Sequence, residues 1–347
     1  MKKALVLSIL GGMVAGVVAV ILLIRFFPSN EDFNLDNPFW NGLKSFREET
    51  GVFSLGQISD LSLVPSSSGT ILFIIGPSAA YNSQKISAIS SYLNSGGALI
   101  LADDFGSGNS ILKGLGLESR FSHHLVVDPL FRGKSSLLAK TVDTVGPLAD
   151  IKRLMFNYPT SLQVNDFGGE IVASSSSFSF FDDNLNGKRE ESEDEGPFPM
   201  IARIPYGKGE IYLMADSSLF INSMLDEAEN REFLQTIMQR KRLFVDTSHY
   251  PVGILSRLRN IEITIYEIIS RLEVRYALFL VLVINIVWLR LERKKAGYEE
   301  DIESVLKRHP EWDKETLKYV QGSMFKVENK NVETGSRVRE KRRDGDG

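Results

Sequence analysis

Cysteine is absent from this chain of 347 residues. The absence excludes disulfide cross-links, a thiolate nucleophile and any zinc site that needs sulfur ligands. Histidine is scarce as well, with four residues in the whole chain. A zinc centre is therefore not expected, and the fold must be stabilised by its apolar core.

A dominant charge of one sign is also missing. The chain has 40 Lys and Arg against 44 Asp and Glu, which gives a formal net charge of −4. Outside the C-terminal tail, no basic face with interleaved aromatic residues is present. The sequence therefore predicts no nucleic-acid partner.

What the chain does contain is two apolar stretches. The first, Ala4–Ile24, holds 21 residues without a charge, enough to cross a hydrocarbon core of about 30 Å as a helix. The alternative is a cleaved signal peptide, because Lys2 and Lys3 form a basic start. Its apolar part would span only about 7–15 residues, and residues 25–28 offer no small-x-small cleavage site. We predict an uncleaved anchor.

The second stretch, Tyr276–Leu289, has 14 residues and would reach about 21 Å as a helix. Arg275 and Arg290 bound it, and their long side chains can extend to the headgroups. Tyr276 and Trp288 lie near its two ends, where interfacial aromatic residues are enriched. A buried core helix or an interfacial helix stays open as the alternative. We predict a second membrane span.

Positive charge predicts the orientation of both spans. Lys2 and Lys3 precede the first span, and a block of Arg and Lys follows the second at 290–295. Both termini are then cytoplasmic in a two-pass protein of the cell membrane. The predicted parts are an anchor at 1–27, an α/β ectodomain at 28–250, an amphipathic stem helix at 251–275, a second transmembrane helix at 276–291 and a basic cytoplasmic tail at 292–347, disordered after about residue 326.

The ectodomain alternates between strand and helix patterns. Thr70–Ile75 and Ala98–Ala102 are continuous apolar runs, typical of strands buried on both faces. Helical spacing is found between them and again after the second run. This order predicts crossover connections and a mostly parallel sheet. Further predicted elements are helices at Asn82–Leu93, Ser110–Leu115 and Asn230–Arg240, and strands at Glu170–Ala173, Met200–Ile204 and Glu210–Ala215.

Two segments carry a family resemblance. Gly96–Leu117 (GGALILADDFGSGNSILKGLGL) and Pro197–Leu225 (PFPMIARIPYGKGEIYLMADSSLFINSML), together with Asn37–Gly42, resemble uncharacterised archaeal-type membrane proteins. The ectodomain of that group is similar to the class I glutamine-amidotransferase-like fold, which also occurs in gliding-motility and intraflagellar-transport proteins. The resemblance covers about residues 30 to 245 and the layout with two spans.

The resemblance implies a flavodoxin-like three-layer α/β sandwich, flanked here by two transmembrane helices. It also implies a binding or scaffold version of the fold, because true amidotransferases carry a cysteine at a strand-to-helix elbow and this chain has none. Proteins of this type are expected beside AAA ATPases and other membrane proteins. The resemblance thus suggests a membrane-protein or ATPase partner for the tail and the ectodomain.

Polar residues follow three predicted strands directly. Open α/β sheets bind ligands in the crevice outside the carboxyl ends of their strands, so we expect these side chains to form a small polar pocket. The alternative is helix capping, for which Asp and Ser are preferred. The candidates are Gly76, Ser78, Asp103, Asp104, Asp216 and Ser217.

The segment Asp182–Glu193 matches the pattern of a calcium-binding loop, D-x-[DN]-x-[DN]-G-x5-E. Such loops supply oxygen ligands at alternate positions, a glycine for the turn and a final bidentate carboxylate. Residues 182–195 contain seven acids and two bases, which a bound Ca²⁺ would offset. A solvated acidic hairpin is the alternative, because a strand-like segment and not a helix precedes the loop. The candidate metal residues are Asp182, Asn184, Asn186, Lys188 and Glu193.

Together these patterns predict a non-catalytic, membrane-anchored binding or scaffold protein that presents an extracytoplasmic α/β domain within a membrane complex. One alternative is a cell-envelope hydrolase that uses the strand-end carboxylates with His123 or His124 as the base. Against it, the sequence has no Gly-x-Ser-x-Gly elbow. The other alternative is an auxiliary transporter subunit, with Asn285 facing a helix of another subunit.

Overall fold

The computed structural model describes residues 2–63, 67–238, 241–250, 253–320 and 322. The chain divides into two compact units, Met1–Ile261 and Glu262–Gly347. The first unit contains an α/β domain and the N-terminal helix α1, Lys2–Phe26. The second contains the long helix α7, Leu272–Arg308.

An eight-stranded sheet forms the centre of the α/β domain, in the order β1-β12-β2-β3-β11-β10-β8-β6. The pairs from β1 to β11 are parallel, and the pairs from β11 to β6 are antiparallel. The predicted α/β class with a large, mostly parallel sheet is confirmed. The strands are β1 Phe53–Leu55, β2 Thr70–Ile75, β3 Ala98–Ala102, β6 Asp143–Thr144, β8 Glu170–Ser174, β10 Pro199–Tyr206, β11 Gly209–Met214 and β12 Arg242–Asp246.

Two small antiparallel pairs lie outside the main sheet. Strand β4, Arg120–Phe121, pairs with β7, Leu162–Gln163. Strand β5, Val126–Val127, pairs with β9, Phe180–Phe181. The segments that leave these short strands form the loops of the candidate site described below.

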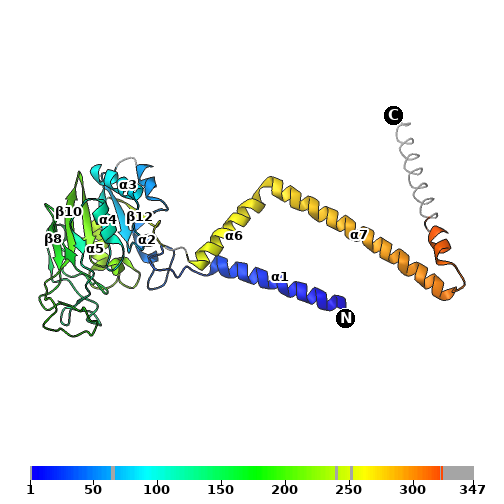
Figure 1. The fold of residues 1–347 in the computed structure, drawn as a ribbon, viewed down its shortest axis with the longest axis horizontal. Helices are drawn as coiled ribbons and strands as arrows, with labels where there is room; N and C mark the ends of the chain where they lie inside the picture. The colour runs from blue at the N-terminus through cyan, green and yellow to red at the C-terminus, as the bar shows by residue number, and fades with distance from the viewer. Residues whose placement is uncertain (1, 64–66, 239–240, 251–252, 321, 323–347) are drawn as a thin grey trace, which may run out of the picture. The chain divides into compact units, whose positions relative to one another are not determined.

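Helices cover both faces of the sheet (Figure 1). Side chains alternate along β2, so Phe73 and Thr70 point to opposite faces. The Phe73 ring lies 5.2 Å from Phe46 of α2 and 5.5 Å from Phe220 of η3. The Thr70 hydroxyl lies 2.8 Å from the Tyr92 hydroxyl of α3. The helices are α2 Lys44–Thr50, η1 Ile58–Leu63, α3 Ser83–Asn94, α4 Gly108–Gly114, η2 Gly146–Leu148, η3 Ser217–Phe220 and α5 Asn230–Met238.

The connections after β3 and β11 leave the sheet on opposite faces. The chain after β3 enters α4, which packs on α3 so closely that a Cβ on Gly114 would lie 2.8 Å from Ile86. The chain after β11 enters η3, on the face of Phe73. Because β3 and β11 are neighbours in the sheet, their carboxyl ends form a topological switch point, where open α/β sheets bind ligands.

One helix in the described residues is long and apolar enough to cross a membrane, judged by length and composition. This segment is Leu272–Leu291 of α7, with 20 residues, and it is longer than the predicted 276–291. The apolar part found in α1 is Gly11–Phe26, which is shorter. The structure therefore supports one candidate span where the sequence predicted two.

The predicted stem and tail also need correction. The stem helix α6 runs from Ile254 to Ser270 and does not continue into the span, because Arg271 has an extended backbone with ψ of 137°. Residues 298–308 of the predicted tail are the end of α7. The next helix covers 314–320, where the Asp313 carboxylate accepts from the Thr316 N–H at 2.8 Å. The predicted disorder beyond 326 lies outside the described residues.

Candidate functional site

Asp103 follows β3 and is completely buried. Its two carboxylate oxygens accept from the N–H of Gly106 at 3.0 Å and of Gly108 at 2.7 Å. Burial raises the pKa of Asp103 to about 6, the Gly108 N–H opposes this shift, and the nearby charge of Asp104 adds to it. Asp103 thus closes the turn that leads into α4.

Asp216 follows β11 and is also completely buried. Its carboxylate accepts from the N–H of Ser218 and the N–H of Asn157, both at 2.6 Å. Burial raises the pKa of Asp216 to about 8, and the charge of Asp104 contributes to the rise. Asp216 therefore acts as the N-cap of η3 and holds the segment that contains Asn157.

Asp104 joins the two strand ends. Its carboxylate accepts from the Ser217 hydroxyl at 3.2 Å, across the β3–β11 junction. None of the chain's four histidines hydrogen-bonds to Asp103, Asp104 or Asp216 in the described residues. The structure thus brings four predicted residues together. The Asp103 and Asp216 carboxylates stabilise the turns after their strands, and Asp104 is hydrogen-bonded to Ser217. These contacts are structural.

Gly76 and Ser78 follow β2, the strand beside β3, and the Gly76 N–H donates to the Ala102 carbonyl at 2.8 Å. The backbone of Gly76 has φ of +53°, and a Cβ there would lie 2.9 Å from the Phe33 ring. The Ser78 hydroxyl donates to the main-chain carbonyl of His249. These two residues attach the N-terminal arm and the segment after β12 to the sheet. The Ser107 N–H donates to the Pro77 carbonyl at 2.8 Å, so this segment adjoins the turn after β3.

A sealed polar network fills the β2–β12 end of the sheet. Asp246, completely buried, accepts from the Tyr81 hydroxyl and lies 3.2 Å from Nδ1 of the buried His249. His249 Nε2 lies 3.1 Å from the Ile75 carbonyl, which also accepts from the Tyr250 hydroxyl at 2.9 Å. Because a carbonyl only accepts, His249 Nε2 must carry a hydrogen.

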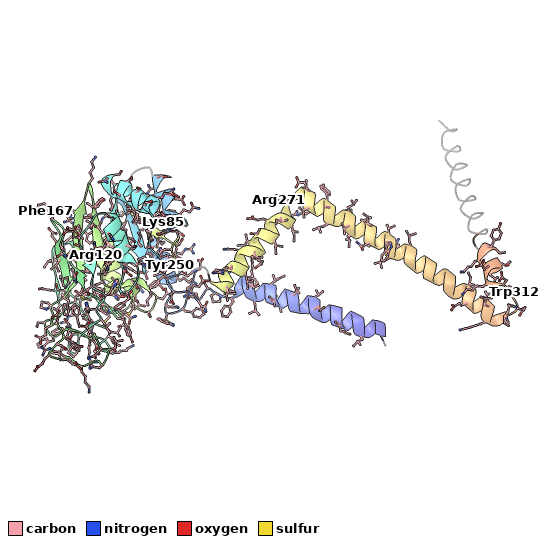
Figure 2. The ribbon with its side chains drawn as sticks, in the orientation of Figure 1. Lys85, Arg120, Phe167, Tyr250, Arg271 and Trp312 are labelled. Carbon is pink, nitrogen blue, oxygen red and sulfur yellow. The ribbon has the colours of Figure 1, made fainter. Side chains whose placement is uncertain are left out.

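The electrostatics of this network differ from those of the β3–β11 end. Burial pushes the pKa of Asp246 upward, but hydrogen bonds from His249, Tyr81 and Ser248 outweigh it and lower the pKa. Lys85 Nζ lies 5.0 Å from the centre of the Tyr81 ring and donates to the Ser248 hydroxyl at 2.8 Å. Lys85 and Tyr250 are labelled in Figure 2.

The sequence contained a signal for this network that the prediction missed. Residues 243–245 (Leu-Phe-Val) form an apolar run that ends in Asp246-Thr247-Ser248, just as β11 is followed by Asp216-Ser217-Ser218. In both places the Asp carboxylate accepts from the Ser N–H two residues later, at 2.8 Å and 2.6 Å. The repeated motif marks a strand end followed by an Asx turn.

An open cleft of about 600 Å³ adjoins the β3–β11 end. Phe105, next to Asp104, lines it from one side, and Tyr158, next to the Asn157 that Asp216 holds, lines it from another. The phenyl ring of Phe105 is half exposed, and Leu185 on the acidic loop is 73% exposed. The lining residues are Phe105, His123, His124, Leu125, Ser136, Leu137, Tyr158, Asp182, Asp183, Leu185, Asn186 and Gly187.

Histidine and aromatic rings shape the wall of the cleft. His124 Nδ1 lies 2.6 Å from the Asp183 carboxylate, and the imidazole stacks on Phe181 at 5.0 Å. The ring of His123 lies 6.3 Å from the ring of Phe105. The cleft thus combines apolar surface with a half-exposed His–Asp pair, a combination found in small-molecule sites.

Strained backbone is concentrated around the cleft. Five non-glycine residues in the described part of the chain have positive φ, and three of them line the cleft: His123 at 59°, Tyr158 at 54° and Leu185 at 59°. The left-handed region costs a residue with a side chain about 1–2 kcal/mol. Such strain gathers at ligand sites, where surrounding contacts enforce it.

The acidic loop, residues 182–195, lines one side of the cleft, and two of its predicted metal ligands are buried. Asp182 is buried, and its carboxylate accepts from the N–H of Asn186 and of Gly187, both at 2.9 Å. Glu193 is also buried and accepts from the N–H of Glu190 at 2.9 Å. The loop thus brings two carboxylates from its two ends into its interior.

The remaining predicted metal residues take part in turns. The side-chain oxygen Oδ1 of Asn184 accepts from the Asn186 N–H at 3.0 Å, and Oδ1 of Asn186 accepts from the Lys188 N–H at 2.7 Å. Within the described residues no group of three or more His, Asp or Glu is arranged to hold a metal ion. Any ion here would need the amide and main-chain oxygens as well as the two carboxylates.

Comparison with known proteins places the domain in a family. Residues 36–238 match the model of a domain of unknown function, DUF4350. No curated protein matches the chain significantly. Similar solved structures include the mmIFT52 N-terminal domain, with 18% identity over 61% of this chain and 94% of that domain, and a TM-score of 0.46.

Two further structures show more remote similarity. The cytoplasmic protein STM3548 from Salmonella typhimurium has 12% identity over 54% of this chain and 75% of that protein, with a TM-score of 0.30. A beta-galactosidase from Bacillus circulans sp. alkalophilus has 12% identity over 47% of this chain, with a TM-score of 0.27. The matched part spans 22% of that enzyme. At these TM-scores the similarity carries no argument about activity or partners.

Proposed function

Since this chain belongs to the DUF4350 family, matched over more than half of its length, and that family has no assigned function, we propose a function from the site itself. The α/β domain is a non-catalytic binding domain, and the cleft beside the β3–β11 switch point is its binding surface. The ligand presents an aromatic or aliphatic group to the cleft, with a polar end that hydrogen-bonds to His124 or Asp183.

One observation carries this proposal. Exposed Phe105, Tyr158 and Leu185 surround a half-exposed His124–Asp183 pair, and three residues of the lining have left-handed backbone. Apolar walls with a few fixed polar groups are typical of ligand pockets. The strain at His123, Tyr158 and Leu185 is the kind found where surrounding contacts hold a binding surface in place.

The geometry favours binding over hydrolysis. A hydrolytic site needs a nucleophile and a base within hydrogen-bond reach of each other. Asp103 and Asp216 are buried and accept from main-chain N–H groups, and the partly exposed Asp104 accepts from the Ser217 hydroxyl. These contacts support a structural role for the carboxylates that the hydrolase alternative would require.

We further propose that the domain is held at the membrane by α7 and α1, with both termini cytoplasmic and the α/β domain outside. The 20-residue apolar segment of α7 supports one span. The other proposed span is in α1, where the sequence Ala4–Ile24 has 21 residues without a charge. The division into anchor, ectodomain, stem, span and tail, the kinship with amidotransferase-like ectodomains, and ATPase or membrane-protein partners belong to the same proposal.

A fragment-binding experiment tests the proposed cleft. The full chain in detergent is screened by ligand-observed NMR with aromatic fragments that carry one hydrogen-bonding group. Fragments that bind should lose affinity in Tyr158→Ser and Leu185→Ser variants. They should keep it in Phe167→Ser, a control residue that is fully exposed, labelled in Figure 2 and outside the cleft lining.

Two results would contradict the proposal. Fragments that bind all variants equally would place binding elsewhere. Turnover of chromogenic ester, phosphate or glycoside substrates that Asp104→Asn abolishes would establish the hydrolase alternative. Unchanged turnover in Asp104→Asn would assign it to a contaminant.

A second binding function is proposed for the acidic loop. Asp182 and Glu193 are buried within the loop, and the side-chain oxygens of Asn184 and Asn186 accept from main-chain N–H groups beside them. A carboxylate has about four acceptor sites, so N–H bonds leave room for Ca²⁺. Calorimetric titration of the full chain with Ca²⁺ should give heat that Asp182→Ala and Glu193→Gln abolish. Silence in the unmodified chain would remove the calcium site.

A further inference from the structure

The loop at residues 37–42, called the aromatic loop, presents two adjacent aromatic side chains to solvent. Phe39 is 41% exposed and Trp40 is 67% exposed. Tryptophan combines a large apolar ring system with a polar N–H, and it is enriched where lipid meets water. An exposed pair of this kind indicates a contact surface when the loop that carries it is held in one position.

Hydrogen bonds fix the main chain of the aromatic loop. Asn37 is completely buried, and its side-chain oxygen accepts from the Phe39 N–H at 2.8 Å. The Asn222 side chain, which follows η3, donates to the carbonyls of Asn37 and Phe39 at 2.9 Å and 2.6 Å. The Ser223 N–H donates to the Trp40 carbonyl at 3.1 Å. The two rings are thus carried on a support that belongs to the α/β domain.

We propose that the aromatic loop lies in the headgroup layer of the membrane, with the rings of Phe39 and Trp40 in contact with lipid. This contact rests on the proposed anchoring of α1 in the bilayer. It adds an orientation to that anchoring, because the loop docks the domain on the membrane surface at a second point besides the helices.

The aromatic loop is tied to the end of α1. Asn41 Nδ2 donates to the main-chain carbonyl of Asn30 at 3.3 Å. Asn30 is four residues beyond Phe26, the last residue of α1, and four extended residues span at most about 14 Å. Trp40, next to Asn41, therefore stays near the point where a membrane-spanning α1 leaves the bilayer. Phe26 is itself 77% exposed and adds an aromatic ring at the end of the helix.

A second connection, from α6, holds the same end of α1. The Arg259 guanidinium donates to the carbonyl of Ile24 at 3.2 Å and to that of Phe27 at 2.7 Å. Pro28 has no N–H, so the Ile24 carbonyl lacks its helical donor four residues later, and Arg259 takes that place. The end of α1 is therefore attached to the segments on both sides of the α/β domain.

Both of these segments join the domain at the carboxyl edge of its parallel strands. Phe33 packs over Gly76, which follows β2, where a Cβ would lie 2.9 Å from the ring. Strand β12 ends at Asp246, and α6 begins at Ile254. The aromatic loop contacts Asn222, which follows β11 and η3. Because the carboxyl ends of parallel strands share one edge of a sheet, the loop and both connections lie at the same edge.

The size of the aromatic pair favours lipid over a protein partner. A Phe or Trp side chain buries about 150–250 Å². Two such side chains supply less than the roughly 800 Å² per partner of a standard protein interface. The neighbouring residues Asp32, Asp36 and Lys44 are exposed and charged, so they do not extend the apolar surface. A lipid interface accepts single aromatic side chains, as in the aromatic belts of membrane proteins.

Tryptophan fluorescence tests the contact directly, because the chain has three tryptophans. In the full chain, Trp288→Phe/Trp312→Phe leaves Trp40 as the single reporter. In phosphatidylcholine vesicles, lipids brominated close to the headgroup should quench Trp40 several-fold more than aqueous iodide does. The matched control adds Trp40→Phe and Phe167→Trp to the same background. Its reporter is at a fully exposed position outside the aromatic loop (labelled in Figure 2) and should be quenched by iodide and not by lipid.

Two quenching results would overturn the proposal. Iodide quenching of Trp40 as strong as that of the control reporter would place the loop in water. Protection of Trp40 from both iodide and brominated lipid would show that protein covers it, either another copy of the chain or a different partner.

An alkaline carbonate wash of the same vesicles separates this contact from the anchoring on which it rests. A chain that the wash retains, with Trp40 quenched by iodide alone, contradicts the lipid contact and leaves the anchoring in place. A chain that the wash releases contradicts the anchoring. Lipid quenching of Trp40 before the wash would still support the contact in that case, and its absence would overturn both.

Discussion

Two neighbouring strand pairs, β3–β11 and β2–β12, carry the same local motif at their carboxyl ends, but the structure around the motif differs. Asp216 and Asp246 each end an apolar strand and accept from a Ser N–H two residues later. Around Asp246, the side chains of Tyr81 and His249 form a buried network, and the neighbouring smaller cleft of about 400 Å³ is lined by Thr247 and Tyr250. Above Asp216 the loops stand apart and leave the cleft.

The comparison indicates that the loops covering the strand ends, and not the strand-end carboxylates, form the proposed binding surface. Strand-end carboxylates at both places stabilise turns, so an Asp at the carboxyl edge of a sheet does not by itself make a site. What differs is the covering chain. At the β3–β11 end an open volume is lined by residues 123–125, 158, 182–183 and 185–187, and three of them, His123, Tyr158 and Leu185, have left-handed backbone.

The largest loss of stability is expected when the buried network around Asp246 is disrupted. Asp246→Ala should destabilise the α/β domain by about 3–5 kcal/mol, because it leaves His249 and Tyr81 buried without their shared acceptor. Asp104→Ala at the open end is the control and should cost less than about 1 kcal/mol, since Asp104 is partly exposed and accepts one side-chain hydrogen bond. Denaturant unfolding of the full chain measures both. Equal losses would refute the contrast.

The next effect is a pH dependence of opposite sign at the two ends. The pKa of Asp216 is raised to about 8, so its contribution to stability is fully present below about pH 4 and is lost as pH rises through about 8. The pKa of Asp246 is lowered, so its contribution is present above about pH 4 and is lost on further acidification.

Variants separate these two contributions. Asp216→Asn should flatten the decline of the unfolding midpoint between about pH 5 and about pH 9. Asp246→Asn should leave that decline in place and flatten the loss on the acid side. A decline that persists unchanged in Asp216→Asn would show that another group controls it.

The sequence predicted the core of the sheet well. Thr70–Ile75 and Ala98–Ala102 coincide with β2 and β3, because a continuous apolar run with turn residues at both ends has few other folded solutions. The strand β12 was missed, because its apolar run of three residues is too short to stand out from a helix end. Its pairing with β1 and β2 depends on contacts distant in sequence.

The candidate site was predicted only in part. The predicted parallel topology placed Asp104 and Ser217 at the same edge of the sheet, and in the structure these two side chains are hydrogen-bonded. It could not show that Gly76 and Ser78, which follow the neighbouring strand β2, also contact Phe33 and His249, because these partners are distant in sequence. The cleft itself depends on His123, Tyr158 and Leu185, whose left-handed backbone has no sequence signature without glycine.

Relief of that strain should be measurable. Leu185→Asn should stabilise the domain by about 1 kcal/mol, because Asn tolerates the left-handed region better than Leu does at φ of +59°. Leu130→Asn is the control, an exposed leucine that is not among the described residues with positive φ, and should give no gain. A gain in both variants would reflect removal of exposed apolar surface and not strain. Thermal unfolding of the full chain suffices.

The smallest effect on stability is expected for the His124–Asp183 pair in the wall of the cleft. His124→Ala should cost at most about 1 kcal/mol, because the His124–Asp183 pair is half exposed and screened by solvent. His309→Ala, which removes the exposed pair of His309 with Glu311 outside the domain, is the matched control. Only His124→Ala should abolish fragment binding in the NMR screen.

If binding survives, the polar end of the ligand does not depend on this pair, and the cleft is reduced to an apolar surface. A loss of several kcal/mol would instead make His124 a structural residue like His249, and the contrast between the two ends of the sheet would disappear.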